Sequence, residues 1–223
     1  MNVGVLLAAG ASTRMGRPKA LVQWQGQSFF AHGVRALWSA CDIVLAVLGS
    51  HAADVRHGVE CEFNQLVEAG DLSRDLHEAH RHGARALEVQ FVTNRAWARG
   101  GMLSSTRVGL AAALRIRPAA ILVLPVDHPE VRGATVLQMS GMMAQALKAF
   151  GGRASRDFAY ALIPRYRGQR GHPLAMTPAL ARAICRDKAA ENLGDAVRRS
   201  SRLVGFMDVA DKGVVTNRNT PKR

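Results

Sequence analysis

The sequence predicts an α/β protein built on a mostly parallel sheet, and two observations point to it. Four short runs are apolar, rich in β-branched residues and of strand length: Val3–Leu7, Ile43–Val47, Val89–Val92 and Ile121–Val126. Between them, apolar residues recur at the three- and four-residue spacings of amphipathic helices, over Phe29–Ala40, Leu66–Ala86 and Ser104–Arg115. Strands that alternate with helices in this way form a parallel sheet with helices packed on it.

The last third of the chain adds a different unit to this pattern. Phe158–Pro164 and Pro173–Met176 are strand-like and flank a connection rich in Gly and Arg. This predicts a pair of strands joined by an ordered basic loop. No internal repeat, long linker or low-complexity tract interrupts the sequence, so we expect a single domain over residues 1–223.

The composition narrows the class of partner. With 48% apolar and 21% charged residues, the chain has the balance of a globular protein rather than a disordered one. Lys and Arg number 30 against 17 Asp and Glu, and the net charge of +13 predicts anionic partners such as nucleotides or other phosphates. Aromatic residues are only 5% and no zinc-finger or RNA-recognition string occurs, so nucleic acid is not an expected partner.

The cysteines and the apolar runs indicate the cellular setting. Cys41, Cys61 and Cys185 are odd in number and widely separated, which predicts neither a disulfide framework nor a paired metal knuckle and fits a reducing cytoplasm. The apolar segment Val3–Ala9 lacks a preceding basic region, which favours a first strand over a signal peptide. No apolar run reaches about 18 residues, so we expect neither a transmembrane helix nor a membrane partner.

A turn of small residues follows the first strand and carries two cations. Residues 6–19 read LLAAGASTRMGRPK, in which Gly10 and its small neighbours let backbone N–H groups approach a ligand closely. Arg14 and Lys19 would neutralise phosphate oxygens. The string is not a Walker A motif, because no Gly-Lys-Ser/Thr follows a four-residue spacer. It is not a dinucleotide fingerprint, because Ser12 occupies the middle glycine position. It predicts a phosphate cradle, with an ordinary strand-to-helix turn as the alternative.

Two later positions have candidate ligand groups. Asp127 follows a buried strand at the edge where open α/β sheets place ligands, and one carboxylate besides phosphates and water is enough for Mg²⁺. The alternative is an Asp that caps the turn before Pro129. Gly100-Gly101 precede Ser104 and Ser105 at an expected helix start, which predicts either serine capping or contact with an anion.

Histidines and arginines gather in two further segments. Arg165, Arg167, Arg170 and His172 surround two glycines in one loop, which predicts a second anion site, with a solvated basic turn as the alternative. A metal site is one interpretation of the second segment, which contains His77, Glu78, His80 and His82. Their spacing does not match His-Glu-x-x-His, so a solvated surface helix is favoured there.

Four blocks in the same order resemble the MobA-like nucleotidyltransferases, and more closely the molybdenum cofactor cytidylyltransferases. They are LLAAGASTRMGRPK at 6–19, NRAWARGGMLSS at 94–105, LPVDHP at 124–129 and GQRGHP at 168–173. The resemblance implies a Rossmann-like three-layer sandwich. It also implies Mg²⁺-dependent transfer of CMP from CTP to molybdopterin, with release of pyrophosphate and with a molybdoenzyme as recipient of the product. Ala8-Ala9-Gly10 favours CTP over GTP, because guanylyl-transferring relatives more often carry LAGG.

The same resemblance assigns roles residue by residue. It implies catalytic roles for Arg14, Lys19 and Asp127, the last as metal ligand. It implies nucleotide contacts from Leu7, Ala8, Ala9, Gly10, Ser12, Arg14, Lys19, Ser104 and Ser105. It also implies that Arg107, beside these serines, is a candidate for contact with the nucleotide or the acceptor. It implies acceptor contacts from Arg170, Gly171 and His172.

The C-terminal segment departs from the family pattern. Residues 208–221 resemble a closing D-x-D-T-P segment, but Asn217 and Asn219 stand where relatives commonly carry Asp. An Asn oxygen can coordinate Mg²⁺ without supplying charge, so Asn219 is expected to be a weakened second ligand. The departure keeps two alternatives open: a related enzyme that uses another nucleotide or phosphorylated acceptor, and a non-catalytic nucleotide binder.

Overall fold

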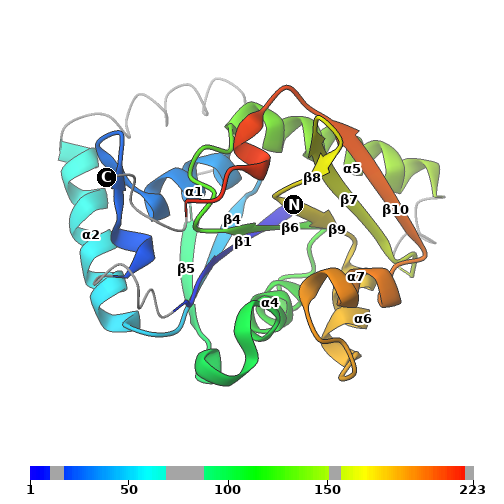
Figure 1. Ribbon diagram of the computed structural model, residues 1–223, viewed down its shortest axis with the longest axis horizontal. Helices are drawn as coiled ribbons and strands as arrows, with labels where there is room; N and C mark the ends of the chain where they lie inside the picture. Colours follow the sequence, from blue (N-terminus) through cyan, green and yellow to red (C-terminus); the bar gives the residue numbers. More distant parts are fainter. Residues whose placement is uncertain (11–17, 69–87, 151–156, 219–223) are drawn as a thin grey trace.

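A mixed sheet forms the centre of the protein in the computed structural model, which describes residues 1–10, 18–68, 88–150 and 157–218 (Figure 1), with only the backbone at 63–68. Within this part of the chain the strand order is β10-β7-β9-β6-β1-β4-β5, with β8 paired to β7. Four strands run parallel to one another: β1 (Asn2–Ala8), β4 (Ile43–Leu48), β5 (Glu88–Thr93) and β6 (Ala120–Pro125). The predicted α/β fold with a mostly parallel sheet is confirmed.

The second half of the sheet mixes strand directions. The strand β9 (Leu174–Met176) lies antiparallel between β6 and β7 (Tyr160–Tyr166), while β10 (Leu203–Asp208) runs parallel to β7. The short strand β8 (Gln169–Arg170) folds back on β7 through Arg167 and Gly168, whose φ angles are 51° and 80°. Two successive positive φ values are the geometry of a tight hairpin turn. The expected pair of strands joined by an ordered basic loop is therefore present.

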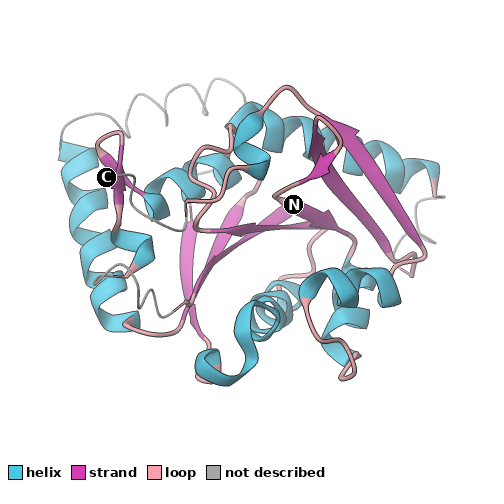
Figure 2. Cartoon of the chain, viewed as in Figure 1, coloured by secondary structure: helices cyan, strands magenta, loops and turns pink. Residues whose placement is uncertain are grey.

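Helices cover both faces of the sheet (Figure 2). The helices α1 (Phe29–Trp38) and α5 (Gly133–Ala149) pack on one face. On the other lie α4 (Trp97–Arg115), α6 (Pro178–Arg186) and α7 (Leu193–Ser200). The helix α2 (Ala52–Glu68) packs beside α1 and the short helix η1 (Lys19–Leu21). The result is a three-layer sandwich.

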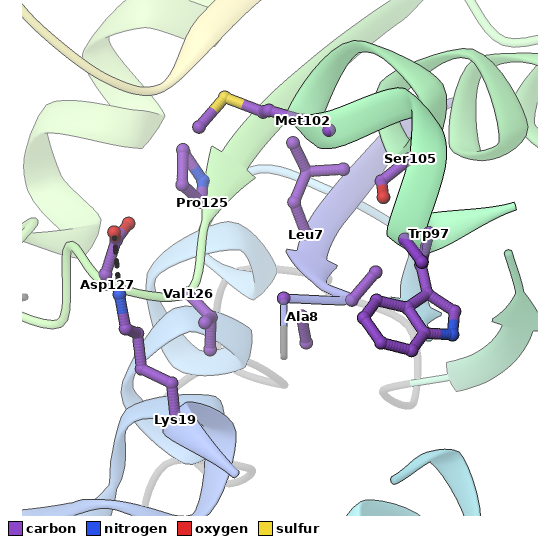
Figure 3. A pocket seen from close by; sticks show the side chains of 13 residues that line it. Leu7, Ala8, Lys19, Trp97, Met102, Ser105, Pro125, Val126 and Asp127 are labelled. Atoms are coloured by element: carbon purple, nitrogen blue, oxygen red, sulfur yellow. Dashed lines mark hydrogen bonds and ion pairs between the residues drawn. The ribbon is translucent and has the colours of Figure 1, made fainter. Parts of the chain in front are cut away.

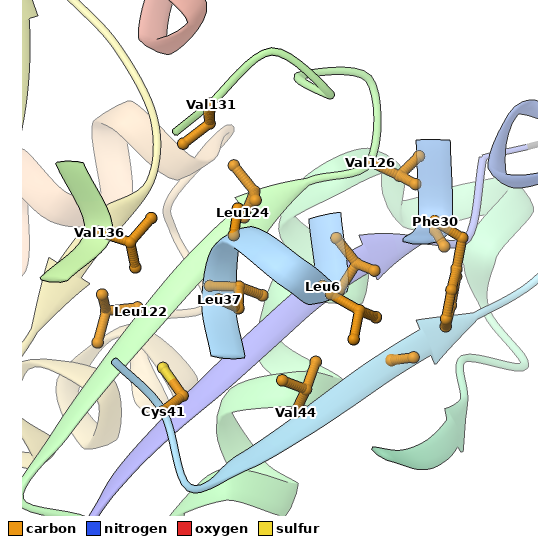
Figure 4. Close-up of a cluster of buried hydrophobic side chains, with 14 of the residues drawn as sticks. Leu6, Phe30, Leu37, Cys41, Val44, Leu122, Leu124, Val126, Val131 and Val136 are labelled. Atoms are coloured by element: carbon orange, nitrogen blue, oxygen red, sulfur yellow. The ribbon is translucent and has the colours of Figure 1, made fainter. Parts of the chain in front are cut away.

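The two faces of the parallel strands bury separate sets of apolar side chains. On one face Leu6, Val44 and Leu124 contact Phe30 and Leu37 of α1 (Figure 4). The opposite side chains of the same strands join a second cluster with α4, α6 and α7, in which Val5, Val47 and Val123 are fully buried. Each such side chain contributes about 1.5–3 kcal/mol relative to exposure to water. Because both faces of these strands are buried, their sequences are continuous runs of apolar residues.

Several elements differ from the sequence prediction. The helix expected at Leu66–Ala86 lies mostly outside the described residues, and α2 occupies 52–68 instead. The helices α5, α6 and α7 and the strand β10 were not predicted. Two of these helices are capped by side chains, since Thr177 accepts from Leu180 N and Asn192 accepts from Asp195 N.

The remaining elements are short and lie at the carboxyl edge of the parallel strands. A hairpin of β2 (Gln23–Trp24) and β3 (Gln27–Ser28) leads into α1, and η3 (Lys212–Val215) is the last helix of the described chain. Asp211 anchors η3, because its carboxylate accepts hydrogen bonds from Arg132 N, Thr135 Oγ1 and Gly213 N. This anchor brings the C-terminal segment back to the end of β6.

Candidate active site

The carboxyl ends of β1 and β6 lie side by side and position the predicted ligand groups. Leu7 of β1 is in register with Pro125 of β6, so the segments that follow the two strands leave the sheet together. Val126 N donates to Leu7 O at 3.0 Å and prolongs this pairing by one residue. The Ala9-Gly10 turn and Asp127 consequently lie at the same edge of the sheet, where α/β folds bind ligands.

A cavity of about 390 Å³, here the first cavity, opens at this edge (Figure 3). Predicted site residues line it: Leu7, Ala8, Ala9, Gly10, Lys19, Ser105 and Asp127. Sequence reasoning assigned no role to the other lining residues, which are Trp97, Ala98, Gly101, Met102, Pro125 and Val126. Figure 3 shows Lys19 and Asp127 on one side of the cavity and the Trp97 indole on the other. Position in the block 94–105 was the signal that could have singled out Trp97.

The Asp127 carboxylate is the most constrained charge in the first cavity. Its side chain is only 13% exposed, and Lys19 Nζ lies 3.4 Å from Oδ2. Asn217 Nδ2 donates to the same oxygen at 2.9 Å, while Arg218 N donates to the Asp127 backbone carbonyl. The other carboxylate oxygen, Oδ1, is buried and has no hydrogen-bond partner within the described residues. A buried carboxylate oxygen that accepts no hydrogen bond is suited to coordinating a cation.

Two histidines, His128 and His172, lie close to Asp127 and are largely shielded from solvent. The rings of His128 and His172 meet edge to face with centroids 4.9 Å apart. Burial lowers the pKa of His172 to about 4, and His128 adds to this effect while Asp127 opposes it. Burial likewise lowers the pKa of His128, although Asp127 and the Gly213 carbonyl raise it. Both imidazoles are therefore neutral at pH 7 and can exchange hydrogen bonds without adding charge.

The serines after Gly100-Gly101 do not cap a helix, which corrects one prediction. The helix α4 already begins at Trp97 and continues through a kink at Gly101, where φ is 55° and ψ is −155°. A positive φ of this kind favours glycine. Asn94 Nδ2 donates to the hydroxyl oxygens of Ser104 and Ser105 at 3.0 Å each, so the serines tie the kinked segment to the end of β5. Of the two, Ser105 lines the first cavity.

Arg107 also lies elsewhere than expected. Its guanidinium donates to the carbonyl oxygens of Ile184 and Asp187, at the C-terminal end of α6. These contacts link α4 to α6, and Arg107 lines neither cavity. Its position explains the error, because it lies on the side of α4 that packs against another helix.

A second cavity of about 830 Å³ adjoins the first, and Gly101 and Met102 line both. The predicted acceptor residues Arg170, Gly171 and His172 all line it. The apolar part of its wall includes Leu103, Ile163, Leu174, Leu193, Val197, Val204 and Phe206, and the polar part includes Glu191, Asn192, Asp195, Arg198 and Ser201. Gly171 fits here because a Cβ would come within 2.3 Å of the Val214 carbonyl oxygen.

The other arginines of the basic loop have partners that hold them outside the cavity wall. Arg165 donates to both carboxylate oxygens of Asp208, at 3.0 and 2.8 Å. The Arg167 guanidinium lies over the ring of Tyr166 at 5.4 Å. Of the three arginines, Arg170 is the one that reaches the second cavity.

Some predicted residues lie outside the described part of the chain. Ser12, Arg14 and Asn219 are among them, as are His77, Glu78, His80 and His82. Across 1–10, 18–68, 88–150 and 157–218, no group of three or more His, Cys, Asp or Glu side chains is placed to hold a metal ion. In the same residues, no helix is long and apolar enough to cross a membrane.

Comparisons with known proteins agree with this geometry. The profile of the MobA-like NTP transferase domain matches residues 4–204. A probable molybdenum cofactor guanylyltransferase of Bacillus cereus (strain ATCC 10987 / NRS 248) is 42% identical over 69 residues, 31% of this chain and 32% of that protein. The chain thus spans about a third of the length of this curated relative.

Two solved structures share the fold over most of their length. A nucleotidyl transferase from Methanothermobacter thermautotroptrophicus has a TM-score of 0.65 at 19% identity, covering 98% of this chain and 92% of that one. Rv0371c from Mycobacterium tuberculosis H37Rv, in complex with manganese, has a TM-score of 0.55 at 20% identity, covering 93% and 88%. At these identities the likeness is one of fold.

Proposed function

The chain belongs to the family of MobA-like NTP transferase domains, and from this premise we propose that it transfers CMP from CTP to molybdopterin, releasing pyrophosphate in a Mg²⁺-dependent reaction. The observation that carries the proposal is the meeting of Lys19 with the partly unpaired carboxylate of Asp127 beside the turn after β1. A cation, an available carboxylate oxygen and closely approaching backbone are what a metal–triphosphate complex requires.

The first cavity supports the binding of the nucleotide donor. Lys19 would hold the triphosphate and stabilise the charge that develops on the leaving pyrophosphate, a role in which Arg14 would join. Trp97 offers an aromatic face opposite Lys19 for the base. Ala9 and Trp97 both line this cavity, and the residue at position 9 supports CTP over GTP because guanylyl-transferring relatives more often carry glycine there.

The donor set around Asp127 fits Mg²⁺. Oxygen ligands are what this ion prefers, and Asp127 Oδ1 is buried and unpaired within the described chain. Asn217 would offer its amide oxygen after rotating its amide group, and Asn219 would be a further ligand. When bound, Mg²⁺ supplies charge neutralisation on the phosphates. The manganese of Rv0371c agrees with a divalent cation in this fold.

The second cavity supports the binding of the acceptor. Arg170, one of its two arginines, would bind an anionic group of molybdopterin, and neutral His172 lines the same cavity near Asp127. The attacking group is a phosphate monoester whose second pKa is near 6, so at pH 7 it is already largely ionised and needs no general base. Positioning and charge neutralisation then account for the chemistry of the transfer.

Pyrophosphate release by the purified full chain tests the proposal, with molybdopterin as acceptor and CTP or GTP as donor. We expect transfer that depends on Mg²⁺ and a higher kcat/KM with CTP. A preference for GTP would overturn the cytidylyl assignment and leave the transferase assignment standing. Saturable nucleotide binding without release would favour the non-catalytic alternative, which the hydrogen bond from Asn217 to Asp127 also favours.

A further inference from the structure

Three charged side chains lie in a row across neighbouring strands beside the second cavity. Arg165 of β7 pairs in register with Arg170 of β8 and with Asp208 of β10. Residues paired in register project from the same face of a sheet, so the three side chains are neighbours. The bidentate hydrogen bonds between Arg165 and Asp208 balance the charge of Arg165. The charge of Arg170 is the one left for a ligand.

Phe206 connects the two arginines of this row. It lies two residues before Asp208 on β10 and therefore on the same face of the sheet. The Arg165 guanidinium carbon is 4.8 Å from the centroid of its ring, and that of Arg170 is 5.0 Å away. Cation–π attraction at these distances orients a guanidinium. Within the described residues Arg170 has no carboxylate partner, so Phe206 is the contact that orients it.

The other arginine of the cavity wall is already engaged. Arg198 donates to Asp195 at 2.5 Å, and both residues line the second cavity. Arg170 is therefore the wall arginine that lacks a carboxylate partner in the described chain, and Phe206 lines the same wall. A cation held in place without an acid partner is suited to binding the anionic group of a ligand whose remaining parts contact the other residues of the cavity wall.

We propose, resting on the acceptor role of the second cavity, that Phe206 is a positioning residue for the acceptor: its ring orients the Arg170 guanidinium, and Arg170 binds the phosphate of the acceptor. Phe206 acts through Arg170 and makes no contribution to binding when Arg170 is absent. The ligand class is a phosphate monoester carried on a pterin-type ring system. Arg165, which is paired with Asp208, also contacts the ring of Phe206.

A double-mutant cycle on the full chain tests this coupling. The probe is 6-hydroxymethylpterin phosphate, whose fluorescence reports binding directly, and unphosphorylated 6-hydroxymethylpterin is the matched control ligand. We expect Arg170→Ala to weaken probe binding about 10- to 150-fold. Phe206→Leu, which keeps apolar volume but removes the π face, should weaken it about three- to tenfold. The double variant should bind as weakly as Arg170→Ala alone, to within about twofold.

Further variants separate positioning from simple packing. Phe206→Tyr keeps the aromatic face and should bind the probe within about twofold of wild type. Binding of the unphosphorylated pterin and of CTP should not respond to Phe206→Leu. Additive losses in the double variant, equal losses for the phosphorylated and unphosphorylated pterins, or no saturable binding of the probe to the wild type would each overturn the proposal.

The outcome for Phe206 is distinguishable from the outcome for the enzyme. Coupled probe binding without nucleotidyl transfer would uphold the role of Phe206 and remove the proposed reaction. Transfer to molybdopterin, together with additive losses in the double-mutant cycle, would uphold the proposed reaction and remove the role of Phe206. In the transfer assay, the matching signature of a positioning role is a higher KM for molybdopterin with an unchanged KM for CTP in Phe206→Leu.

Discussion

The first and second cavities adjoin at Gly101 and Met102 but are built in different ways. The first is formed by two adjacent parallel strand ends, one kinked helix and Lys19 of η1, so its residues come from four short stretches of sequence. The second is lined by residues of β7, β8, β9, β10, α4 and α7 and of the loops between them. A short motif can therefore encode the first cavity, whereas the second depends on how distant elements pack.

The two cavities also differ in how they use charge. In the first, Lys19 and Asp127 face each other directly at 3.4 Å, an arrangement suited to a ligand with several phosphates and a metal ion. In the second, one arginine that has no carboxylate partner in the described chain is oriented by an aromatic ring. The comparison indicates neutralisation of charge in the first cavity and orientation of a single anionic group in the second. Four experiments test this distinction.

The largest effect is expected at Asp127. Asp127→Asn keeps the shape of the side chain but removes its charge, and we expect kcat to fall at least about 10³-fold because a metal-binding carboxylate is lost. Pyrophosphate release over a Mg²⁺ titration measures this, with circular dichroism as a check of the fold. Asp157→Asn, on a side chain that is 94% exposed, is the matched control. Wild-type turnover at limiting Mg²⁺ would remove Asp127 from the metal site.

Lys19→Ala should have the next largest effect. Because Lys19 would contact the triphosphate both before and during the transfer, we expect a higher KM for CTP together with a lower kcat, about 100-fold in kcat/KM. Lys19→Arg keeps the charge and should recover part of this loss. Unchanged nucleotide affinity and unchanged turnover in Lys19→Ala would contradict the role of the first cavity.

Arg170→Ala and His172→Ala test the division between the cavities. We expect each to raise KM for molybdopterin by up to about 150-fold while leaving KM for CTP within about twofold. Steady-state kinetics with each substrate varied in turn measure both constants. Arg167→Ala, on the same hairpin but stacked on Tyr166, is the matched control. A loss of CTP affinity with an unaltered acceptor KM would assign this loop to the nucleotide.

The smallest expected effect concerns stability and pH. Because the pKa of His172 is lowered to about 4 in the folded protein, the unfolded chain binds a proton at a pH where the folded chain does not. Its contribution to stability is therefore fully present above about pH 6.5 and is lost as the pH falls from there towards 4. Between pH 6.5 and 5 the free energy of unfolding should drop by about 1.5 kcal/mol.

Urea unfolding of His172→Gln measures that contribution. The variant should lose about this much of the pH dependence, whereas His57→Gln, at an exposed position on α2, should keep it. An identical pH profile for wild type and His172→Gln would show that the imidazole does not titrate in the way its burial indicates.

The features of the site that the sequence analysis missed or misplaced have a common physical origin: they depend on contacts beyond the local sequence. Ser104, Ser105 and Arg107 follow a glycine pair that looks like a helix start, yet the segment is helical from Trp97 and merely kinks at Gly101. Local propensity cannot distinguish a kink from a start, because both place glycine before an amphipathic run. The contact between Asn217 and Asp127 joins residues 90 positions apart, and no local pattern indicates it.

The parallel half of the sheet and seven of the residues that line the first cavity could be predicted from the sequence, because double burial demands continuous apolar strands and parallel strands place their carboxyl ends at one edge. The second cavity follows from the tertiary structure. This structure brought Arg165, Arg170, Phe206 and Asp208 into one stack by pairing β8, β7 and β10. The reason is that strand order and register follow from the packing of whole layers, which no short stretch of sequence encodes.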